Sequence, residues 1–271
     1  MNAWLNNTLV DIRLTFRDRQ AIFWNYAFPL FFLFLFSSIF ARGNPKAVAM
    51  LLPGLLCISM MSAGLFGMSI GLVSDRERGI LRRYQLAPIH PLVIISSQII
   101  SGFVVVLSTI VLQLVLARMI YKLEIAGSLW SLAVMAGAGA LAFLSIGFVI
   151  ASVAENAKSA QVMSNLLFFP LMFLGGAAFP IQFLPPAIRK LSLLLPSRYL
   201  TEGLGRVIND GAGVSGNLPN LAVMASTFVV ALIVAAKIFR WDSREPLSAA
   251  KKAWVAAIAL VFVIAALWAR T

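Results

Sequence analysis

The chain has 271 residues, of which 61% are hydrophobic, and its mean hydropathy is +0.92. Soluble domains are about half apolar, so an excess gathered into long runs argues against a soluble domain and predicts an all-α polytopic integral membrane protein. The formal net charge of +12 then indicates membrane topology rather than nucleic-acid binding, because Lys and Arg collect in cytoplasmic loops beside anionic lipid. With Cys57 as the single cysteine, an internal disulfide is excluded.

Residues 1–20 are predicted to form an amphipathic helix in the membrane interface. Leu5, Leu9, Ile12 and Phe16 recur at helical spacing, and the polar residues lie away from this stripe. The alternative is a polar leader that frays. No convincing small-residue cleavage site follows, so we expect no signal peptide.

Seven apolar runs approach the length of about 20 residues that a helix needs to cross a bilayer. We predict an interface helix (1–20), a six-span core (21–240) and a cytoplasmic linker with an extra seventh span (241–271). The seven predicted spans are residues 22–41, 48–73, 92–120, 129–153, 162–181, 221–239 and 253–269.

The distribution of Lys and Arg predicts that the N-terminus is cytoplasmic. In that orientation 13 of the 22 Lys and Arg residues lie inside, and four of the nine outside fall in one long loop of little topological weight. A seventh span would place the C-terminus outside.

Residues 75–91 form a charged loop between the second and third predicted spans. We predict one short helix over residues 75–86, stopped by Pro88. Its apolar face would hold Ile80, Leu81 and Tyr84. Such a helix across the inner mouth of the protein can pass movement from a soluble partner into the membrane. The alternative is a loop whose arginines only fix the topology, and the charges alone leave both interpretations open.

The segment 182–220 is mixed in polarity and predicts two short outer helices. Pro185-Pro186 would start the first, and Pro196 would end it. Ser197 would cap the second, whose apolar stripe is Leu200, Leu204, Val207 and Ile208. Together they suggest a re-entrant hairpin. The preceding run carries Pro170, Gly175-Gly176 and Pro180, so it should kink or break towards its outer end.

Several chemical signatures are missing from the sequence. No Asp or Glu lies in the middle of a predicted span, which argues against a proton-coupled carrier. The phosphate-binding P-loop and the common protease and esterase motifs are also missing, so we expect no catalytic residues, no metal site and no ATP hydrolysis in this chain. A self-sufficient carrier or channel stays open as the alternative. Its only polar candidates, which more often bond neighbouring helices, are Gln98, Gln113, Ser145 and Asn165.

The order of these features resembles the permease subunits of type-2 class ABC exporters, which include drug-resistance, Nod-factor and polysaccharide exporters. Residues 77–88 (ERGILRRYQLAP) look like that family's inner-loop motif, E-R-G-T-L-E-x-L-x-x-x-P, with Ile80 in place of Thr and Arg83 near a usual acidic position. Residues 175–185 and 195–199 resemble its second shared region, G-x-x-F-P-x-x-x-L-P followed by P-x-x-Y. The resemblance covers about residues 5–240 and does not extend to 241–271.

This resemblance implies the membrane-spanning subunit of an ATP-driven exporter in the bacterial cytoplasmic (inner) membrane. A separate ATP-binding cassette subunit would bind ATP and Mg, and two permease copies would pair, as a homodimer, among membrane lipids. The implied coupling residues are Asp75, Arg76, Glu77, Arg78, Gly79, Ile80, Leu81, Arg82, Arg83, Tyr84 and Pro88. The implied outer exit residues are Gly175, Gly176, Phe179, Pro180, Leu184, Pro185, Pro196 and Tyr199. An amphipathic drug or a lipid-linked glycan would suit such apolar spans; uptake by the same machinery is the alternative to export.

Overall fold

The computed structural model describes residue 13 and residues 16–41, 44–81 and 91–238. These residues form helices joined by turns and short loops, without a strand among them. Most of the predicted interface helix (1–20) and the whole predicted seventh span (253–269) lie outside the described residues. Five described helical stretches are long and apolar enough to cross a membrane: Phe23–Phe40, Pro45–Glu77, Ser96–Tyr121, Leu129–Val153 and Ser215–Ile238.

In each of the first two spans, α-helical and π-helical segments follow one another without a break. The first span consists of α2 (Arg19–Ile22), η1 (Phe23–Ala27), α3 (Phe28–Phe36) and η2 (Ser37–Ala41). The second consists of α4 (Pro45–Ser62), η3 (Ala63–Met68) and α5 (Ser69–Glu77). Pro29 has no N–H, so the Asn25 carbonyl lacks its usual helical donor. Thr109 Oγ1 donates to that carbonyl at 2.9 Å and thereby ties the third span to the first.

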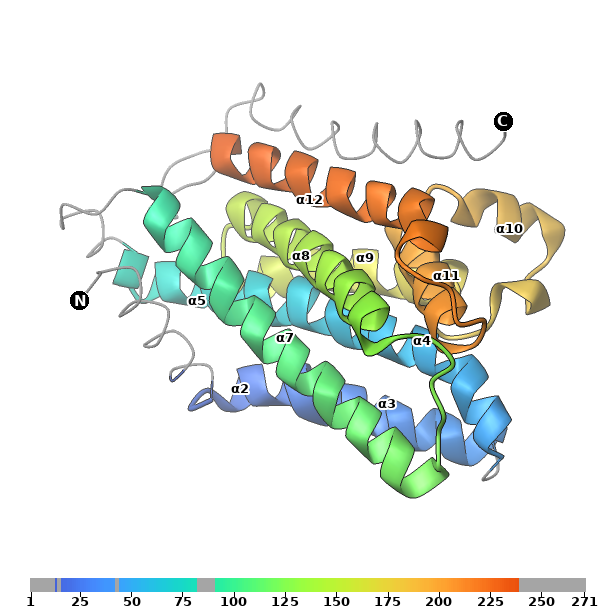
Figure 1. Ribbon diagram of the computed structural model, residues 1–271. Coiled ribbons are helices and arrows are strands. Elements are labelled where there is room, and N and C mark those ends of the chain that lie inside the picture. Colours follow the sequence, from blue (N-terminus) through green and yellow to red (C-terminus); the bar gives the residue numbers. More distant parts are fainter. Residues whose placement is uncertain (1–12, 14–15, 42–43, 82–90, 239–271) are drawn as a thin grey trace.

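The remaining helices are α7 (Pro91–Tyr121), α8 (Leu129–Val153), α9 (Ala157–Leu174), α10 (Pro186–Ser192), α11 (Pro196–Ile208) and α12 (Leu218–Ile238), with 3₁₀ turns η4 (Ile181–Phe183) and η5 (Ser215–Asn217). The fourth span has the predicted bounds, because Ser128 caps it by accepting from Ser131 N at 3.1 Å. Figure 1 shows α8 between α7 and α12, with α4 and α5 behind α7 and α8.

Three predictions about residues 162–220 need correction. The helix at the predicted fifth span (162–181) is α9, which begins at Ala157 and stops at Leu174, so the predicted bounds are wrong and the break towards its outer end is confirmed. Since α9 is not among the five stretches above, its crossing of the membrane stays a prediction. Ser197 does not cap α11, because Pro196 occupies the first helical position and Leu195 precedes it as the cap. Pro196 does not end α10 either, since that helix already ends at Ser192.

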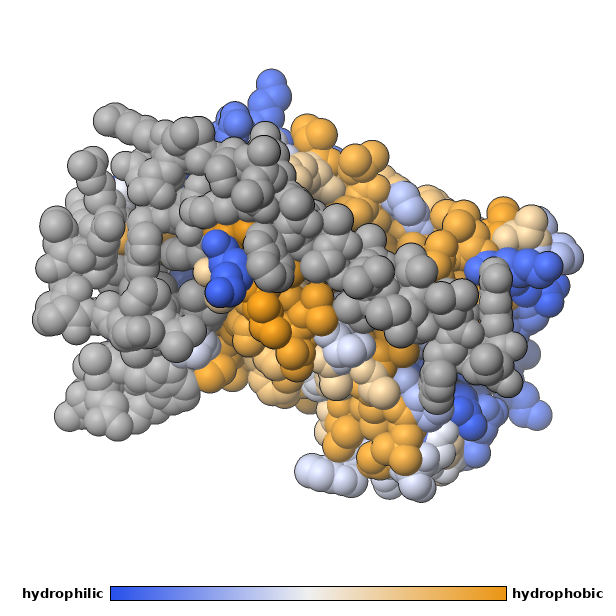
Figure 2. Space-filling view, turned by 90° about the horizontal axis from the view of Figure 1, so that it is seen from above, coloured by the Kyte–Doolittle hydropathy of each residue, from blue (hydrophilic) through white to orange (hydrophobic). Residues whose placement is uncertain are grey.

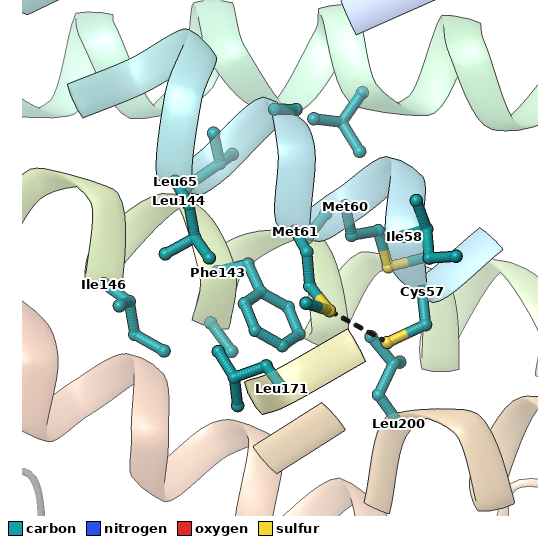
Figure 3. Close-up of a cluster of buried hydrophobic side chains, with 14 of the residues drawn as sticks. Cys57, Ile58, Met60, Met61, Leu65, Phe143, Leu144, Ile146, Leu171 and Leu200 are labelled. Carbon is teal, nitrogen blue, oxygen red and sulfur yellow. Dashed lines mark hydrogen bonds between the residues drawn. The ribbon is translucent and has the colours of Figure 1, made fainter. Parts of the chain in front are cut away.

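The core lies where α4, η3 and α8 cross. Gly64 and Gly147 let the two backbones touch: a Cβ on Gly147 would lie 1.9 Å from the Gly64 carbonyl oxygen. Around this crossing, buried apolar side chains pack together (Figure 3), and α11 contributes Leu200. Figure 2 shows hydrophobic residues across the middle of the molecule and hydrophilic ones gathered at the end that holds α10 and α11.

Candidate functional site

The predicted coupling segment begins where the second span ends. The prediction of one helix over residues 75–86 is wrong, because α5 ends at Glu77 and the chain turns at Arg78 and Gly79. Gly79 has a φ of 73°, a left-handed conformation that closes helices and that glycine adopts without strain. Helical backbone resumes at Ile80 and Leu81. The other predicted coupling residues, Arg82, Arg83, Tyr84 and Pro88, lie outside the described residues.

Arg76, near the end of α5, is a buried cation that lies against the end of the fourth span, α8. Only 5% of its surface is exposed. Its Nη1 donates to the Ala151 carbonyl at 2.9 Å, and its Nη2 donates to the Ala154 carbonyl. The last carbonyls of a helix have no partner within the helix and carry partial negative charge. Arg76 therefore satisfies two such groups at the end of α8 and fastens α5 to it.

The next residue, Glu77, contacts the start of α9. Its Oε1 accepts a hydrogen bond from the Ala157 N–H at 3.2 Å, and Ala157 is the first residue of α9. A carboxylate is favoured at this end of a helix, where unpaired N–H groups carry partial positive charge. Two consecutive side chains of α5 thus bind the end of α8 and the start of α9.

The junction between α8 and α9, here the inner junction, is itself well ordered by local hydrogen bonds. Asn156 Oδ1 accepts from Ser159 N at 2.8 Å, and Ser159 Oγ accepts from Asn156 N at 3.1 Å, which together form a capping box. This capping box was not predicted. Asn156 is a recognisable N-cap residue in the sequence, but Ser159 stands where the usual signature has Glu or Gln.

A cavity of about 420 Å³, lined by both polar and apolar side chains, lies beside this segment. Asp75 and Arg78 line it from the second span, Arg17 and Asn25 from the chain around the first span, and Gln98 from α7. The described part of the predicted coupling segment therefore faces both the inner junction and a cavity of mixed polarity between three spans.

The predicted exit residues form a tight turn after α9, here the outer turn. Gly176 has a φ of 83°, and Ala178 N donates to the Met172 carbonyl at 2.9 Å to close the helix end. At Gly175 a Cβ would lie 1.8 Å from Ser197 Oγ. That Oγ instead donates to the Leu171 carbonyl at 2.8 Å, which ties the start of α11 to the end of α9.

The other exit residues extend this turn. Pro180 precedes η4 and Pro185 precedes α10, while Pro196 starts α11. Leu184 accepts at its carbonyl from Arg189 Nε at 2.9 Å. The rings of Phe179 and Phe173 stack 6.3 Å apart.

Tyr199 is buried, which raises the pKa of its phenol, and its hydroxyl donates to the Leu193 carbonyl at 2.9 Å. Gly176 and Pro180 also border a cavity of about 640 Å³ shared with α4 and α11. The structure thus brings the exit residues together around one turn, and their role in an exit stays a prediction.

Of two polar candidates within the spans, Gln113 joins helices and Ser145 bonds within its own helix. Gln113 is fully buried; its Oε1 accepts from Ser59 Oγ at 2.7 Å, and its Nε2 donates to the Pro29 carbonyl at 3.2 Å. Ser145 donates to the Leu141 carbonyl within its own helix. Their hydrogen-bonding capacity is used for packing, as expected for polar groups in an apolar interior.

Comparisons with known proteins agree with this architecture. The family described as ABC-2 type transporter matches residues 4–208. A Bacillus subtilis protein named as a transport permease, YvfS, is 22% identical over 85% of this chain and 95% of its own length. An Escherichia coli protein named as a probable multidrug ABC transporter permease, YbhS, is 25% identical over 70% of this chain and 50% of its own. Nodulation protein J of Rhizobium leguminosarum is 30% identical over 41% of this chain and 42% of its own length. The chain therefore belongs to the ABC-2 type transporter family.

Proposed function

We propose that this membrane subunit of an ABC transporter is an exporter permease, driven by a separate subunit that binds ATP and Mg. The cargo would be an amphipathic molecule, such as a hydrophobic drug or a lipid-linked glycan. The names of the relatives, a multidrug permease and a nodulation protein, support a cargo of this kind. The membrane would be the bacterial cytoplasmic membrane, with the N-terminus and residues 75–91 on the cytoplasmic side.

The observation that carries this proposal is the double contact made by Arg76 and Glu77. The second span is a continuous helical stretch, Pro45–Glu77, through the buried core. Its last two residues bind the ends of α8 and α9 through charged side chains. A push on the turn that follows would move α5 together with two further helices. The segment is therefore suited to pass movement from a soluble ATPase into the membrane.

The docking surface for the ATPase would start at Arg78 and continue along the segment after it. Arg78 is exposed, while Leu81 is buried and fixes the start of that segment against the core. Arg82 and Arg83 follow in the sequence. We expect these three arginines to contact the partner and Arg76 with Glu77 to transmit the movement.

A second copy of this chain would pack against an aromatic surface formed by the first span and α9, here the aromatic surface. It holds the half-exposed rings of Phe31, Phe40, Phe169 and Phe173. The ring of Phe179 lies 5.9 Å from that of Phe40 and stacks on that of Phe173, which joins the two helices into one face. Large rings bring much contact area and little entropy cost to an interface.

Purification of the tagged chain from its native membrane in mild detergent tests the partner. We expect a soluble subunit carrying a P-loop at equal stoichiometry, lost in the double variant Glu77→Ala/Arg78→Ala. The matched control is Lys190→Ala/Asp210→Ala, which removes one exposed base and one exposed acid from the opposite end. Recovery of the chain alone in several mild detergents would instead favour a self-sufficient carrier.

Transport assays test coupling separately from docking. Leu81→Pro should abolish efflux while the protein still inserts and its partner still hydrolyses ATP. The charge reversal Glu77→Lys should act likewise, because it places a cation at the positive end of α9. Normal efflux in both variants would contradict the coupling role.

Disulfide cross-linking tests the second copy. Cys57 is the only cysteine and is buried, so it should give no background cross-link. If the aromatic surface is the dimer interface, a cysteine introduced by Phe173→Cys should form a symmetric cross-link in native membranes. Val229→Cys, equally half-exposed but on α12, is the control and should not cross-link. The reverse pattern would move the dimer interface to α12.

A further inference from the structure

A groove of about 1050 Å³ lies between the outer halves of α7 and α8. Leu107, Val111 and Val115 line it from α7, and Ala133 and Ala136 line it from α8. The small side chains of Ala133 and Ala136 leave a space, which Leu132 of α8 and the larger side chains of α7 border. The groove is open to the surroundings and largely apolar, so it suits a hydrocarbon chain.

The outer end of this groove, here the rim, is charged. Arg118, Lys122 and Glu124 stand there, and all three side chains are exposed. Among the hydrogen bonds and ion pairs of the described residues, none involves the side chain of Arg118 or Lys122. Two cations and one carboxylate leave the rim with a net positive charge that complements an anion.

The length of α7 places the rim at the depth of lipid headgroups. The stretch Ser96–Tyr121 has 26 residues and therefore extends about 39 Å at 1.5 Å per residue, whereas the hydrocarbon core is about 30 Å thick. The exposed Trp130 is the second residue of α8 and follows Leu129, which lines the groove. Tryptophans of this kind sit at the membrane interface. The apolar walls then lie in the hydrocarbon, and the cations lie among phosphates.

The backbone at Lys122 is unusual and firmly held. Its φ of 53° makes it the one non-glycine residue with a positive φ among the described residues. Leu123 N donates to the Ala117 carbonyl at 3.4 Å and so closes the end of α7. Ala126 N donates to the Ile208 carbonyl of α11 at 3.0 Å. Glycine would take this position without strain. The chain instead presents a lysine here, on a rim fixed by α11.

We propose that this groove binds one phospholipid with an anionic headgroup. Its phosphate would lie between Arg118 and Lys122, and an acyl chain would lie along the walls of α7 and α8. The proposal rests on the embedding of the chain in a membrane and not on coupling to an ATPase. Failure to recover an ATPase in the purification experiment would therefore leave the lipid proposal intact. Failure of lipid binding would likewise leave the proposed coupling to an ATPase intact.

Native mass spectrometry of the full chain, titrated with phosphatidylglycerol or phosphatidylcholine of the same acyl chains, tests the proposal. A basic residue near an anionic headgroup contributes about fivefold in affinity. Because Glu124 offsets one of the two cations, the net charge of the rim should favour phosphatidylglycerol about fivefold. Arg118→Gln/Lys122→Gly should remove this preference. Glycine is chosen because it keeps the left-handed turn, so that the loss cannot come from a misplaced rim.

The matched control is Lys158→Gln/Lys190→Gln, which removes the same charge from exposed positions elsewhere and should keep the preference. Ala133→Trp fills the groove and should weaken binding of both lipids. Circular dichroism and size-exclusion profiles confirm that each variant is folded. Equal affinity for the two lipids in the unaltered chain, or an equal loss in the control, would overturn the proposal. Tighter binding of phosphatidylethanolamine would assign the groove to a zwitterionic lipid instead.

Discussion

The inner junction and the outer turn join neighbouring helices by different means. At the inner junction, Arg76 and Glu77 reach helix ends through flexible charged side chains. At the outer turn, Gly175 lets backbone and the Ser197 hydroxyl meet directly, with no space for a Cβ. Side-chain contacts can follow small helix movements, whereas such backbone contacts cannot. Under the proposed function, the inner end would transmit movement, and the outer turn would stay fixed while the helices move.

Substitution at the outer turn should give the largest effect. Gly175→Ala places a Cβ 1.8 Å from Ser197 Oγ and 2.4 Å from the Leu171 carbonyl oxygen. We expect the free energy of unfolding to fall by about 3 kcal/mol, the upper range for overpacking. Unfolding by SDS in mixed micelles measures this change. The control is Gly71→Ala, because a Cβ there meets nothing within 4 Å, and it should be neutral or slightly stabilising. Similar values for the two variants would contradict a rigid outer turn.

The next largest effect is expected at the inner junction. Arg76→Met keeps much of the side-chain volume but removes the donors to Ala151 and Ala154. Leaving buried carbonyls without a partner should cost about 2 kcal/mol, measured by the same unfolding assay. Arg78→Met is the control, because Arg78 is exposed, and it should change stability by less than about 0.5 kcal/mol. If Arg78→Met destabilised as much, Arg76 would not be the residue that fastens α5 to α8.

Much of the fold could be predicted from the sequence, because long apolar runs and a capping serine define spans such as 129–153. The site could be predicted only in part. The charge pattern of residues 75–91 located the segment, but the break at Gly79 depends on one backbone angle that the charges do not reveal. The contact between Arg76 and Ala151 joins residues 75 positions apart, and a single sequence carries no signal for such a pair. The outer motif was recognised by resemblance, yet only the structure shows why its glycines matter: Gly175 lies against Ser197 of α11, and Gly176 has a φ of 83° and lies against Ile181 of η4.

At the outer end, the lysine on the rim gives a smaller effect with the opposite sign. Lys122→Gly places glycine at a φ of 53°, where other residues are strained by about 1 kcal/mol. We expect the free energy of unfolding to rise by up to that amount, even though a charge is lost. Lys122→Ala, which removes the charge and keeps the strain, is the control and should not stabilise. Stabilisation by both variants would show that charge repulsion, not backbone strain, is what glycine relieves.

The smallest effect is expected from Glu77→Gln, and it separates charge from hydrogen bonding at the inner junction. The carbonyl oxygen of the introduced glutamine can still accept from the Ala157 N–H, so only the negative charge at the start of α9 is lost. Such a charge contributes about 0.3–1 kcal/mol at low ionic strength and is screened by salt. The difference in unfolding free energy between the unaltered chain and the Glu77→Gln variant should therefore be measurable at low salt and vanish at about 1 M salt, where the screening length is about 3 Å. A difference that persists at high salt would mean that the carboxylate acts through a direct contact which glutamine cannot reproduce. In that case Glu77 would hold α9 as rigidly as Gly175 holds the outer turn, and the contrast between the two ends would disappear.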